Sequence, residues 1–577
     1  MPEPVTLALA LVILYSLVVV EILLVFLAMR SARGNSGPGR RWLASAERWL
    51  GCLAARRRVS VAAVGALALA GRALLAPALP IREPLITDEF IYLLAADTFA
   101  SGRLTNPPHP MWKHLESIHT LQQPTYMSMY QPAQGLILAA GIRLAGHPWA
   151  GVYFSAALMC AAICWMLQGW LPPRWALLGG LLVVLRLGLF GYWMNSYWGG
   201  AAPAIGGALV LGALPRMMRK LRLRYTLLMG LGAAILAASR PYEGGALCLG
   251  VGAVALAWMF GKRGPPLRSS LAGFFLPMGL ILSLMAISIG YYFSRVTGSP
   301  FRLPEVVQRE PYARAPIFLW ETAGPELSYR HKALHDFYDW EMKEVLPEIQ
   351  SVPGMIWNAL KKLIGAWLFY LGPALTVPLL FLPRIVKRDR RLRALLIAGG
   401  VTIVALALDA WFYAHYAAPI AGLLFAVIVQ GIRHLRVWRR RRGEEGLLLA
   451  RAIPAICVAM IAVRLVAQPL GIRFPPAWPM TWYHTPEGNV GRARVLASLG
   501  AMDGKQLAIV RYQAGHNAVM NEWVYNRADI DGAKVVWARE MDAAENRQLL
   551  QYFHDRRAWL VEADETPPRV SPYPPQP

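Results

Sequence analysis

The chain has 577 residues, of which 56% are hydrophobic and 16% are charged. This composition excludes an ordinary soluble multidomain protein and indicates one that is embedded in a membrane. The formal net charge of +25 would also fit a nucleic-acid-binding protein, but the positive charge is confined to short loops between apolar segments, so we expect no nucleic-acid partner.

The first predicted transmembrane helix covers about residues 5–28. It lacks the basic start and the small-residue cleavage site of a signal peptide, so we expect it to be retained. Residues 30–58 hold eight arginines against one acid, Glu47, which places this segment in the cytoplasm by the positive-inside rule. A second span at about 60–80 then leads the chain to the extracytoplasmic side. Residues 1–59 are thus an addition in front of the main transmembrane domain.

The first long outer loop, residues 81–148, begins with Thr87-Asp88-Glu89. Thr87 is a good helix N-cap, and a helix N-terminus keeps acids in its first turn ionised. Asp88 or Glu89 could therefore serve as a base or hold a cation, although acidic first turns are also common in ordinary helices. Phe90 and its apolar neighbours predict a helix that lies against the bilayer surface. A short helix at about 132–145 is expected to lie at the interface.

Apolar stretches long enough to cross a hydrocarbon core of roughly 30 Å recur up to residue 466. They predict about twelve crossings, with a second long outer loop at 294–355. After the first loop, the four loops assigned to the cytoplasm hold twenty Lys or Arg residues, as the positive-inside rule requires. The transmembrane domain is thus predicted at 60–466. Its later spans are at about 149–169, 174–191, 200–215, 225–239, 244–260, 270–293, 357–382, 394–410, 416–432 and 447–466.

Residues 467–577 have a different composition. Four prolines predict a stiff linker at their start: Pro469, Pro475, Pro476 and Pro479. The remaining pattern predicts a small extracytoplasmic α/β domain that ends in a disordered tail, Pro567–Pro577. Its predicted strands are Leu507–Tyr512, Val535–Arg539 and Trp559–Glu562, and its predicted helices are at about 488–500 and 541–556.

Three motifs lie at the outer mouths of predicted spans and are candidates for substrate binding. Asn195 and Tyr197 follow the fourth span among aromatic residues. Amides and aromatic faces suit a sugar, while aromatic residues also form interfacial belts without any ligand.

The other two motifs contain cationic groups. Arg240 sits beside Tyr242 and Glu243, and a guanidinium in this position could grip a phosphate in a bidentate manner or simply pair with the acid. His415 and Tyr416 follow the tenth span and could likewise meet phosphate or anchor the interface.

Histidine spacing leaves a metal site open. His109, His114 and His119 step by five, which does not keep them on one helical face. His331 and His335 are one turn apart, a spacing that can bind zinc but that polar loops also produce by chance. A divalent cation is therefore neither required nor excluded. The chain contains no P-loop and no GxGxxG, so no nucleotide cofactor is expected.

Taken together, residues 60–440 resemble the GT-C class of integral-membrane glycosyltransferases, near the protein O-mannosyltransferase and aminoarabinose-transferase families. The resemblance rests on the Asp88-Glu89 pair in the first outer loop, on Tyr130-Gln131-Pro132 before the next helix, and on the Arg240 and His415 motifs. It implies a polytopic α-helical membrane protein with about twelve transmembrane helices, in the plasma or inner membrane, with its C-terminal domain outside.

The resemblance also implies an activity. In this class a polyprenyl-phosphate sugar is the donor and the first-loop acid is the catalytic base, which would be Asp88. The residues expected to bind substrate are Glu89, Tyr130, Asn195, Tyr197, Arg240, Tyr242, Glu243, His415 and Tyr416. The chain departs from the family in lacking a clear second-loop Asp, for which Glu243 is a candidate substitute, and in carrying His415 where Arg or Lys is usual. Which acceptor is used, a glycan, a lipid or a protein, is left open.

Two other functions remain at this stage. A transporter or flippase would use ionisable residues inside the membrane, and Glu21, Arg72 and Arg186 lie within predicted spans. No internal repeat accompanies them, which argues against this alternative. A non-catalytic scaffold that presents the C-terminal domain would not need an acid at the rim of the membrane.

Overall fold

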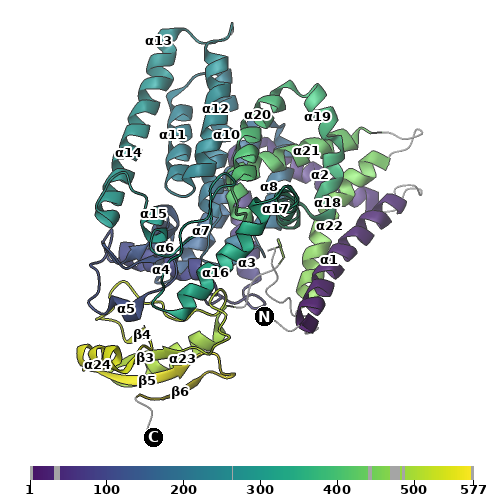
Figure 1. The fold of residues 1–577 in the computed structure, drawn as a ribbon. Helices are drawn as coiled ribbons and strands as arrows, with labels where there is room; N and C mark the ends of the chain where they lie inside the picture. Colours follow the sequence, from purple (N-terminus) through teal and green to yellow (C-terminus); the bar gives the residue numbers. More distant parts are fainter. Residues whose placement is uncertain are drawn as a thin grey trace.

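The computed structural model describes residues 4–31, 39–262, 264–438, 445–467, 481–483 and 488–573. A helical body carries a small C-terminal domain at one end, in yellow at the bottom of Figure 1. The four linker prolines lie outside the described residues.

Each of the twelve segments predicted to be spans is helical. Among the described residues, eight helices are long and apolar enough to cross a membrane, and all eight coincide with predicted spans. The fold class is thus confirmed as a helical membrane protein with a small C-terminal sheet, whereas the number of crossings stays a prediction. The main helices are α1 (Pro4–Ser31), α3 (Arg57–Leu74), α7 (Pro148–Trp170), α8 (Pro173–Leu187), α10 (Ala201–Arg219), α11 (Leu223–Ala237), α12 (Pro241–Met259), α14 (Leu276–Thr297), α17 (Val352–Ala366), α20 (Arg390–Leu408), α21 (Ala421–Arg436) and α22 (Glu445–Ala467).

Short helical pieces extend or join several of these spans. The basic segment after α1 contains α2 (Gly39–Ala55). Helix α3 ends at Leu74, before the predicted boundary at 80. Before α14 lie α13 (Leu267–Ser270) and a π-helical turn at Leu271–Phe275. After α17 come a π-helical turn at Trp367–Leu371, α18 (Gly372–Thr376), a 3-10 turn at Val377–Phe381 and α19 (Leu382–Arg388). A 3-10 turn at Ala414–Ile420 precedes α21.

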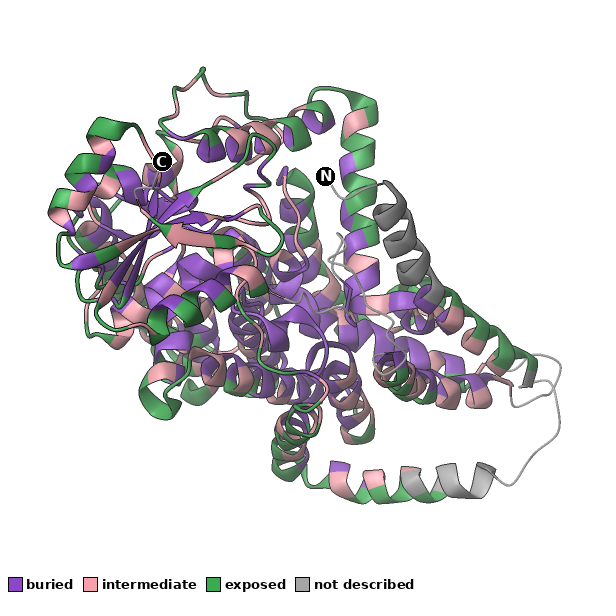
Figure 2. Cartoon of the chain, turned by 90° about the horizontal axis from the view of Figure 1, so that it is seen from below, coloured by how far each residue is buried: buried purple, intermediate pink, exposed green. Residues whose placement is uncertain are grey.

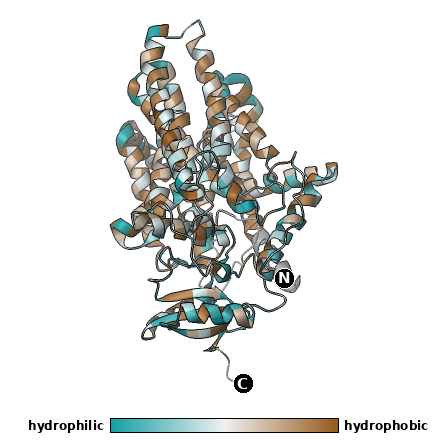
Figure 3. Cartoon of the chain, turned by 60° about the vertical axis from the view of Figure 1, so that its left-hand side comes forward, coloured by the Kyte–Doolittle hydropathy of each residue, from teal (hydrophilic) through white to brown (hydrophobic). Residues whose placement is uncertain are grey.

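Large apolar side chains on the outside of the body face the surroundings. On α14, Leu276, Leu280 and Ile287 are each more than half exposed, and the helices above the C-terminal domain carry the most hydrophobic residues (Figure 3). Contiguous exposed apolar surface is costly in water and favourable in lipid. The surface of the body therefore agrees with the sequence in indicating a membrane.

The two long loops and the C-terminal domain lie at the same end of the body, which we call the loop face (Figure 1). Helix α4 packs against α6, and α15 packs against β1. The sequence predicted α6 at this position. The elements of the loop face are α4 (Thr87–Ala100), α5 (Trp112–Leu115), β1 (Thr120–Leu121), β2 (Met127–Ser128), α6 (Pro132–Ala145), α15 (Pro304–Arg309) and α16 (Lys332–Ile349).

Helix α4 differs from the prediction in two ways. Its N-cap is Ile86, and Thr87 is its first helical residue rather than its cap. The Glu89 carboxylate replaces the missing cap, because it accepts hydrogen bonds from the backbone N–H groups of Leu85 and Ile86 at 2.9 and 3.3 Å. The apolar side of α4 does not lie on a bilayer surface, since Phe90 stacks on Tyr525 of the C-terminal domain. A second protein layer covers that side.

The C-terminal domain is a four-stranded sheet in the order β4-β3-β5-β6. Strand β3 (Lys505–Arg511) runs parallel to β4 (Val535–Arg539) and β5 (Arg556–Glu562), and β6 (Arg569–Pro572) runs antiparallel to β5. Helices α23 (Val490–Ala501) and α24 (Ala543–Tyr552) flank the sheet, whose strands β3 and β4 are largely buried (Figure 2). Part of the tail that was predicted to be disordered is thus a strand, because pairing with β5 satisfies its backbone groups.

The charges inside the body have partners within the protein. Arg186 of α8 donates to Glu21 of α1 at 2.5 Å, and both side chains are almost fully buried. Arg72 of α3 donates to the Asn195 side chain at 2.7 Å and to a backbone carbonyl at 2.8 Å. The three residues that would have served a transporter therefore connect helices to one another.

Candidate active site

Asp88 is held at the start of α4 by two side chains from the first long loop. The Tyr130 hydroxyl donates to Asp88 Oδ1, and His119 Nδ1 lies 3.2 Å from the same oxygen. The Asp88 side chain is 14% exposed, and no hydrogen bond to its second oxygen, Oδ2, is found among the described residues. One carboxylate oxygen is thus fixed in place while the other is left for a ligand.

The local backbone explains how these groups meet. His119 adopts a positive φ of 63°, a conformation that is uncommon for a residue with a side chain. It directly precedes β1, which pairs with β2 just before Tyr130. Tyr130 is fixed in turn by stacking on Tyr92 of α4, with ring centroids 5.0 Å apart. The sequence singled out Asp88 and Tyr130 but considered His119 only as a metal ligand.

Glu89 is used differently from its neighbour. It is buried, and its Oε1 accepts from the backbone N–H of Tyr197 at 3.0 Å, while Oε2 accepts at the start of α4. Burial raises the pKa of Glu89 to about 6, although the three backbone donors favour its ionised form. Glu89 therefore connects α4 to the loop after α8, and both of its oxygens are occupied within the protein.

A second cluster surrounds Arg240 at the start of α12. Its Nη1 lies 3.6 Å from Glu243 Oε1, and its guanidinium carbon lies 4.0 Å from the centre of the Tyr416 ring. The Arg240 side chain is 21% exposed, whereas that of Glu243 is 4% exposed. The structure thus brings Tyr416, from the motif after the tenth predicted span, next to the Arg240 and Glu243 pair, and it leaves the cation partly accessible.

Tyr92 connects the two clusters. Burial raises the pKa of its phenol, the positive charge of Arg240 lowers it, and the negative charge of Asp88 raises it again. Because one hydroxyl responds to both charges, Asp88 and Arg240 each lie within electrostatic reach of Tyr92. Tyr92 lies one helical turn after Asp88 on α4, a spacing that could have identified it from the sequence.

Two further acids near Arg240 were missed by sequence reasoning. Glu305, in the first turn of α15, acts electrostatically on Tyr92 and Glu243. Asp409, which follows α20, is buried, and burial raises its pKa to about 7. Both acids lie far from Arg240 in the chain. Glu305 supplies an acid from the second long loop, where the sequence offered no clear one.

The remaining predicted residues divide into two groups. His415 lies beside Tyr416, with ring centroids 5.1 Å apart; its Nδ1 is 2.9 Å from the Tyr192 hydroxyl, and its buried Nε2 has no partner among the described residues. Asn195 is occupied by Arg72 and by two backbone carbonyls. Tyr242 donates to the carbonyl of Ala405 at 3.0 Å, away from the guanidinium. His415 thus belongs with the Arg240 cluster, whereas Asn195 and Tyr242 hold the scaffold.

The C-terminal domain also reaches the site. Tyr525 stacks on Phe90 with ring centroids 4.5 Å apart. Burial raises the pKa of the Tyr525 phenol well above its usual value, and the charge of Asp88 contributes to this rise. Its buried hydroxyl has no partner among the described residues. The sequence gave no signal for this contact, because more than 400 residues separate the two rings.

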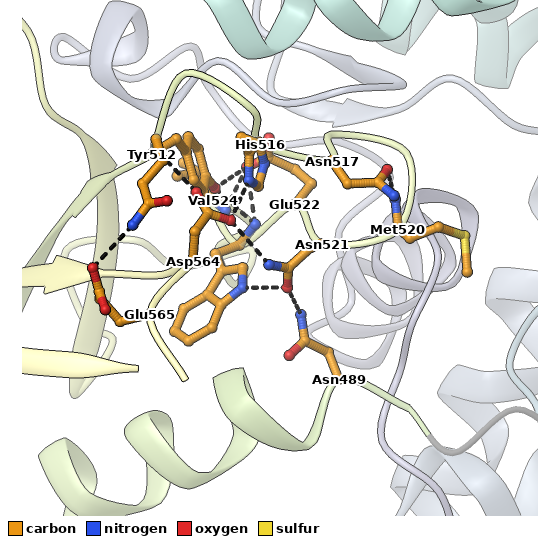
Figure 4. Close-up of polar contacts among 12 residues, drawn as sticks. Asn489, Tyr512, His516, Asn517, Met520, Asn521, Glu522, Val524, Asp564 and Glu565 are labelled. Carbon is orange, nitrogen blue, oxygen red and sulfur yellow. Dashed lines mark hydrogen bonds and ion pairs between the residues drawn. The ribbon is translucent and has the colours of Figure 1, made fainter. Parts of the chain in front are cut away.

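A polar network fixes the loop that carries Tyr525 (Figure 4). The Tyr512 hydroxyl donates to Glu522 at 2.7 Å, and His516 pairs with Asp564 at 2.8 Å. Arg492 of α23 donates to the backbone carbonyl of Tyr525 at 2.8 Å. The phenol is therefore held against α4 by the sheet of the C-terminal domain rather than by a free loop.

The histidines considered as possible metal ligands from the first long loop have different partners. His109 meets Asp531 at 3.2 Å, His114 bonds to two backbone carbonyls, and His119 belongs to the Asp88 cluster. Among the described residues, no group of three or more His, Cys, Asp or Glu side chains could hold a metal ion. The five cysteines are free.

No protein-family model matches this chain, and no curated protein sequence matches it. Among solved structures, it is similar to an Archaeoglobus fulgidus oligosaccharyltransferase tethered with an acceptor peptide (11% identity, TM-score 0.49), with 88% of this chain and 69% of that chain covered. It is also similar to ArnT from Cupriavidus metallidurans in the apo state (13% identity, TM-score 0.48, 88% and 92% covered). The same ArnT bound to undecaprenyl phosphate gives 12% identity and a TM-score of 0.45, with 88% and 93% covered. Both proteins are GT-C glycosyltransferases, and every one of these TM-scores lies below 0.5.

Proposed function

We propose that this protein is a membrane glycosyltransferase that moves a sugar from a polyprenyl-phosphate donor to an acceptor at the extracytoplasmic face. The observation that carries the proposal is a fixed, partly exposed carboxylate, Asp88, and a partly exposed guanidinium, Arg240, whose charges both act on the Tyr92 phenol. An acid that can take a proton and a cation that can hold a phosphate are the two groups such a transfer needs.

In the proposed reaction, Asp88 Oδ2 takes the proton from an acceptor hydroxyl. The acceptor oxygen attacks the anomeric carbon in line, a new glycosidic bond forms, and the bond between that carbon and the phosphate oxygen breaks with inversion. The electron pair leaves with the polyprenyl phosphate, and the proton passes from Asp88 to water. Tyr130 and His119 orient Asp88 through its other oxygen.

Arg240 stabilises the departing phosphate. A guanidinium matches phosphate geometry and keeps its charge at all physiological pH values. Glu243 lies at 3.6 Å, too far for a hydrogen bond, so it orients the guanidinium without occupying its donors. His415, buried beside Tyr416, adds a further nitrogen, Nε2, that has no partner among the described residues. Because the lipid phosphate is itself the leaving group, the reaction needs no nucleotide.

The experiment that tests this proposal measures lipid binding and lipid identity together. Lipids extracted from the purified protein are analysed by mass spectrometry, and binding of undecaprenyl phosphate is measured by its thermal stabilisation of the protein in nanodiscs. We expect a polyprenyl phosphate or its sugar conjugate in the extract, and stabilisation that Arg240→Ala abolishes. Arg222→Ala, at an exposed arginine before α11, is the matched control. Equal stabilisation of both variants would refute the proposed donor site.

The orientation is tested separately by accessibility in intact cells. Single cysteines at Ser101 and Ser498, which are exposed on the loop face, and at Lys220, exposed between α10 and α11, are placed in a chain with Cys52→Ser. We expect an impermeant thiol reagent to label the first two and not the third. The reverse pattern would put the site on the cytoplasmic side and exclude an extracytoplasmic reaction.

A further inference from the structure

A cavity lies between the two long loops, next to the candidate active site. Its volume is about 500 Å³, within the range of ligand-binding pockets. The first loop contributes Trp112, Glu116 and Gln122 to its wall, and the second contributes Gln308, Tyr312 and Arg330. Several residues of its rim are exposed, so a water-soluble group can enter.

Two buried acceptors in the wall have no partner. Gln122 donates its amide N–H to the Leu115 carbonyl at 2.9 Å, and Gln308 donates to the Tyr338 hydroxyl at 2.8 Å. Both side chains are more than nine-tenths buried, and neither amide oxygen is bonded by any described residue. A buried acceptor without a donor costs free energy, and both amide side chains belong to the cavity wall, which is thus polar at these positions.

The charges in the wall are balanced. Arg330 donates to Glu116 at 2.8 Å, and the Tyr312 hydroxyl donates to the same oxygen at 2.8 Å. His331 lies 3.3 Å from the other oxygen of Glu116. Because the guanidinium is already paired, the cavity offers little to an anion.

Aromatic rings supply the apolar part of the wall. Trp112, with Arg330 against one face of its ring at 4.9 Å, and Tyr312 both line the cavity. Rings beside amide and carboxylate acceptors match a sugar, which has hydroxyl donors around apolar C–H faces. A neutral carbohydrate therefore fits this wall better than a phosphate.

The cavity shares its inner wall with the candidate active site. Thr120 and Leu121 line it and directly follow His119, which contacts Asp88. Gln308 lies between Val307, also in the wall, and Arg309, whose charge acts on Tyr130 and Glu305. The cavity thus borders the Asp88 cluster through β1 and α15, although Asp88, His119 and Tyr130 do not line it.

We infer that this cavity binds a neutral carbohydrate and that it presents the acceptor glycan to Asp88. The second part rests on the proposed transferase function, whereas carbohydrate binding itself does not. The acceptor class is thus a glycan rather than a protein or a lipid phosphate.

The test is binding of neutral disaccharides (maltose, cellobiose, lactose, mannobiose and diacetylchitobiose) to the full-length protein in nanodiscs, by saturation-transfer NMR. Val307→Phe fills the cavity from α15. Val306→Phe places the same ring on the neighbouring residue, which is 46% exposed and does not line the cavity. We expect at least one disaccharide to bind the wild type and Val306→Phe, and to bind Val307→Phe at least tenfold more weakly.

A second measurement does not depend on that variant folding. A nitroxide label on Gln123→Cys, at the exposed rim of the cavity, should broaden the resonances of the bound disaccharide, and a label on Gln548→Cys of α24 should not. Cys52 and Cys248 are replaced in both proteins. Absence of binding by all five disaccharides, equal binding by the two valine variants, or equal broadening by the two labels would overturn the inference.

Two further probes, inorganic phosphate and a Gly-Ser-Thr peptide, test other classes of acceptor. If either probe bound while the disaccharides did not, and if Val307→Phe abolished that binding, the inference would be overturned in favour of that class. A different result would separate the two proposals. If Arg240→Ala still bound undecaprenyl phosphate normally while the disaccharides also bound, the proposed transferase function would be refuted and the carbohydrate site would remain.

Discussion

Charged side chains are buried and paired in the helical body, whereas at the loop face they are partly exposed and incompletely paired. In the body, Arg186 and Glu21 are 1% and 2% exposed and lie 2.5 Å apart, so that each neutralises the other. At the loop face, Asp88 and Arg240 are 14% and 21% exposed and neither is fully used by the protein. Since an unpaired charge in a low-dielectric region is expensive, Arg186 and Glu21 can stay buried only because each has the other as its partner. Under the proposed function, substrate would complete the pairing of the partly accessible charges at the loop face.

The largest expected effect tests the body. Arg186→Met leaves Glu21 buried without its partner and should lower the free energy of unfolding by about 3–5 kcal/mol. Thermal unfolding of the purified protein in nanodiscs measures the change. Arg224→Met, at an exposed arginine, should change stability by no more than about 0.5 kcal/mol. Similar stabilities for the two variants would show that the body tolerates an unpaired charge. The body and the loop face would then not differ in this respect.

The second prediction tests the loop face. Asp88→Asn keeps the size of the side chain but removes the proton acceptor, so transfer should fall by about 10²-fold or more, at least about 2.7 kcal/mol of barrier. Stability should change by less than about 1 kcal/mol, because the group lies in a partly exposed first turn. Lipid binding serves as the control and should persist. Normal transfer in Asp88→Asn would exclude this residue as the base.

Glu89 provides a pH test of the difference between the two adjacent acids. Its pKa is raised from 4.5 to about 6 by burial, so the folded state binds this proton more tightly than the unfolded chain does. The resulting stability is fully present below about pH 4.5 and is lost as the pH rises through 6, about 2 kcal/mol in all.

The measurement compares the wild type with Glu89→Gln. Between pH 4.5 and 7, the free energy of unfolding of the wild type should fall relative to that of Glu89→Gln. The difference between the wild type and Asp88→Asn serves as the reference. A shift in the opposite direction would show that the three backbone donors outweigh burial at Glu89.

The fourth prediction distinguishes a phosphate grip from a simple ion pair. Arg240→Lys keeps the charge but loses the planar fork, so transfer should fall by about tenfold or more, roughly 1.4 kcal/mol. Steady-state transfer at saturating acceptor measures it, and Arg222→Lys is the control. Full activity of Arg240→Lys would mean that the charge alone is needed, to balance Glu243.

The smallest effect concerns the C-terminal domain. Tyr525→Phe removes a buried hydroxyl that has no partner among the described residues, so stability should not fall. If that hydroxyl bonds substrate, transfer should fall by two- to tenfold, in line with about 0.5–1.5 kcal/mol for one hydrogen bond. Tyr552→Phe, at the end of α24, should leave transfer unchanged. Equal activities of both variants would confine the site to the membrane domain and its loops.

The sequence determined the parts of this protein that follow from local pattern. Apolar length predicted the helices of the body, and strand-like runs predicted three strands of the C-terminal domain. Helix-start chemistry singled out the pair Asp88 and Glu89, and the family resemblance pointed to Asp88. These features depend on neighbours within a few turns of chain, so composition and spacing suffice. The strand Arg569–Pro572 was missed because its pairing with β5, not its own polar, proline-flanked sequence, orders it.

Only the tertiary structure decided which charges meet. Adjacent acids in one motif took different roles, because the backbone N–H of Tyr197 reaches Glu89 and the loop that carries His119 reaches Asp88. The contacts of Tyr525 and Glu305 with the site join elements that are far apart in the chain. A side chain's partner across such a distance depends on how whole helices pack, and packing energy is spread over many residues that carry no motif of their own.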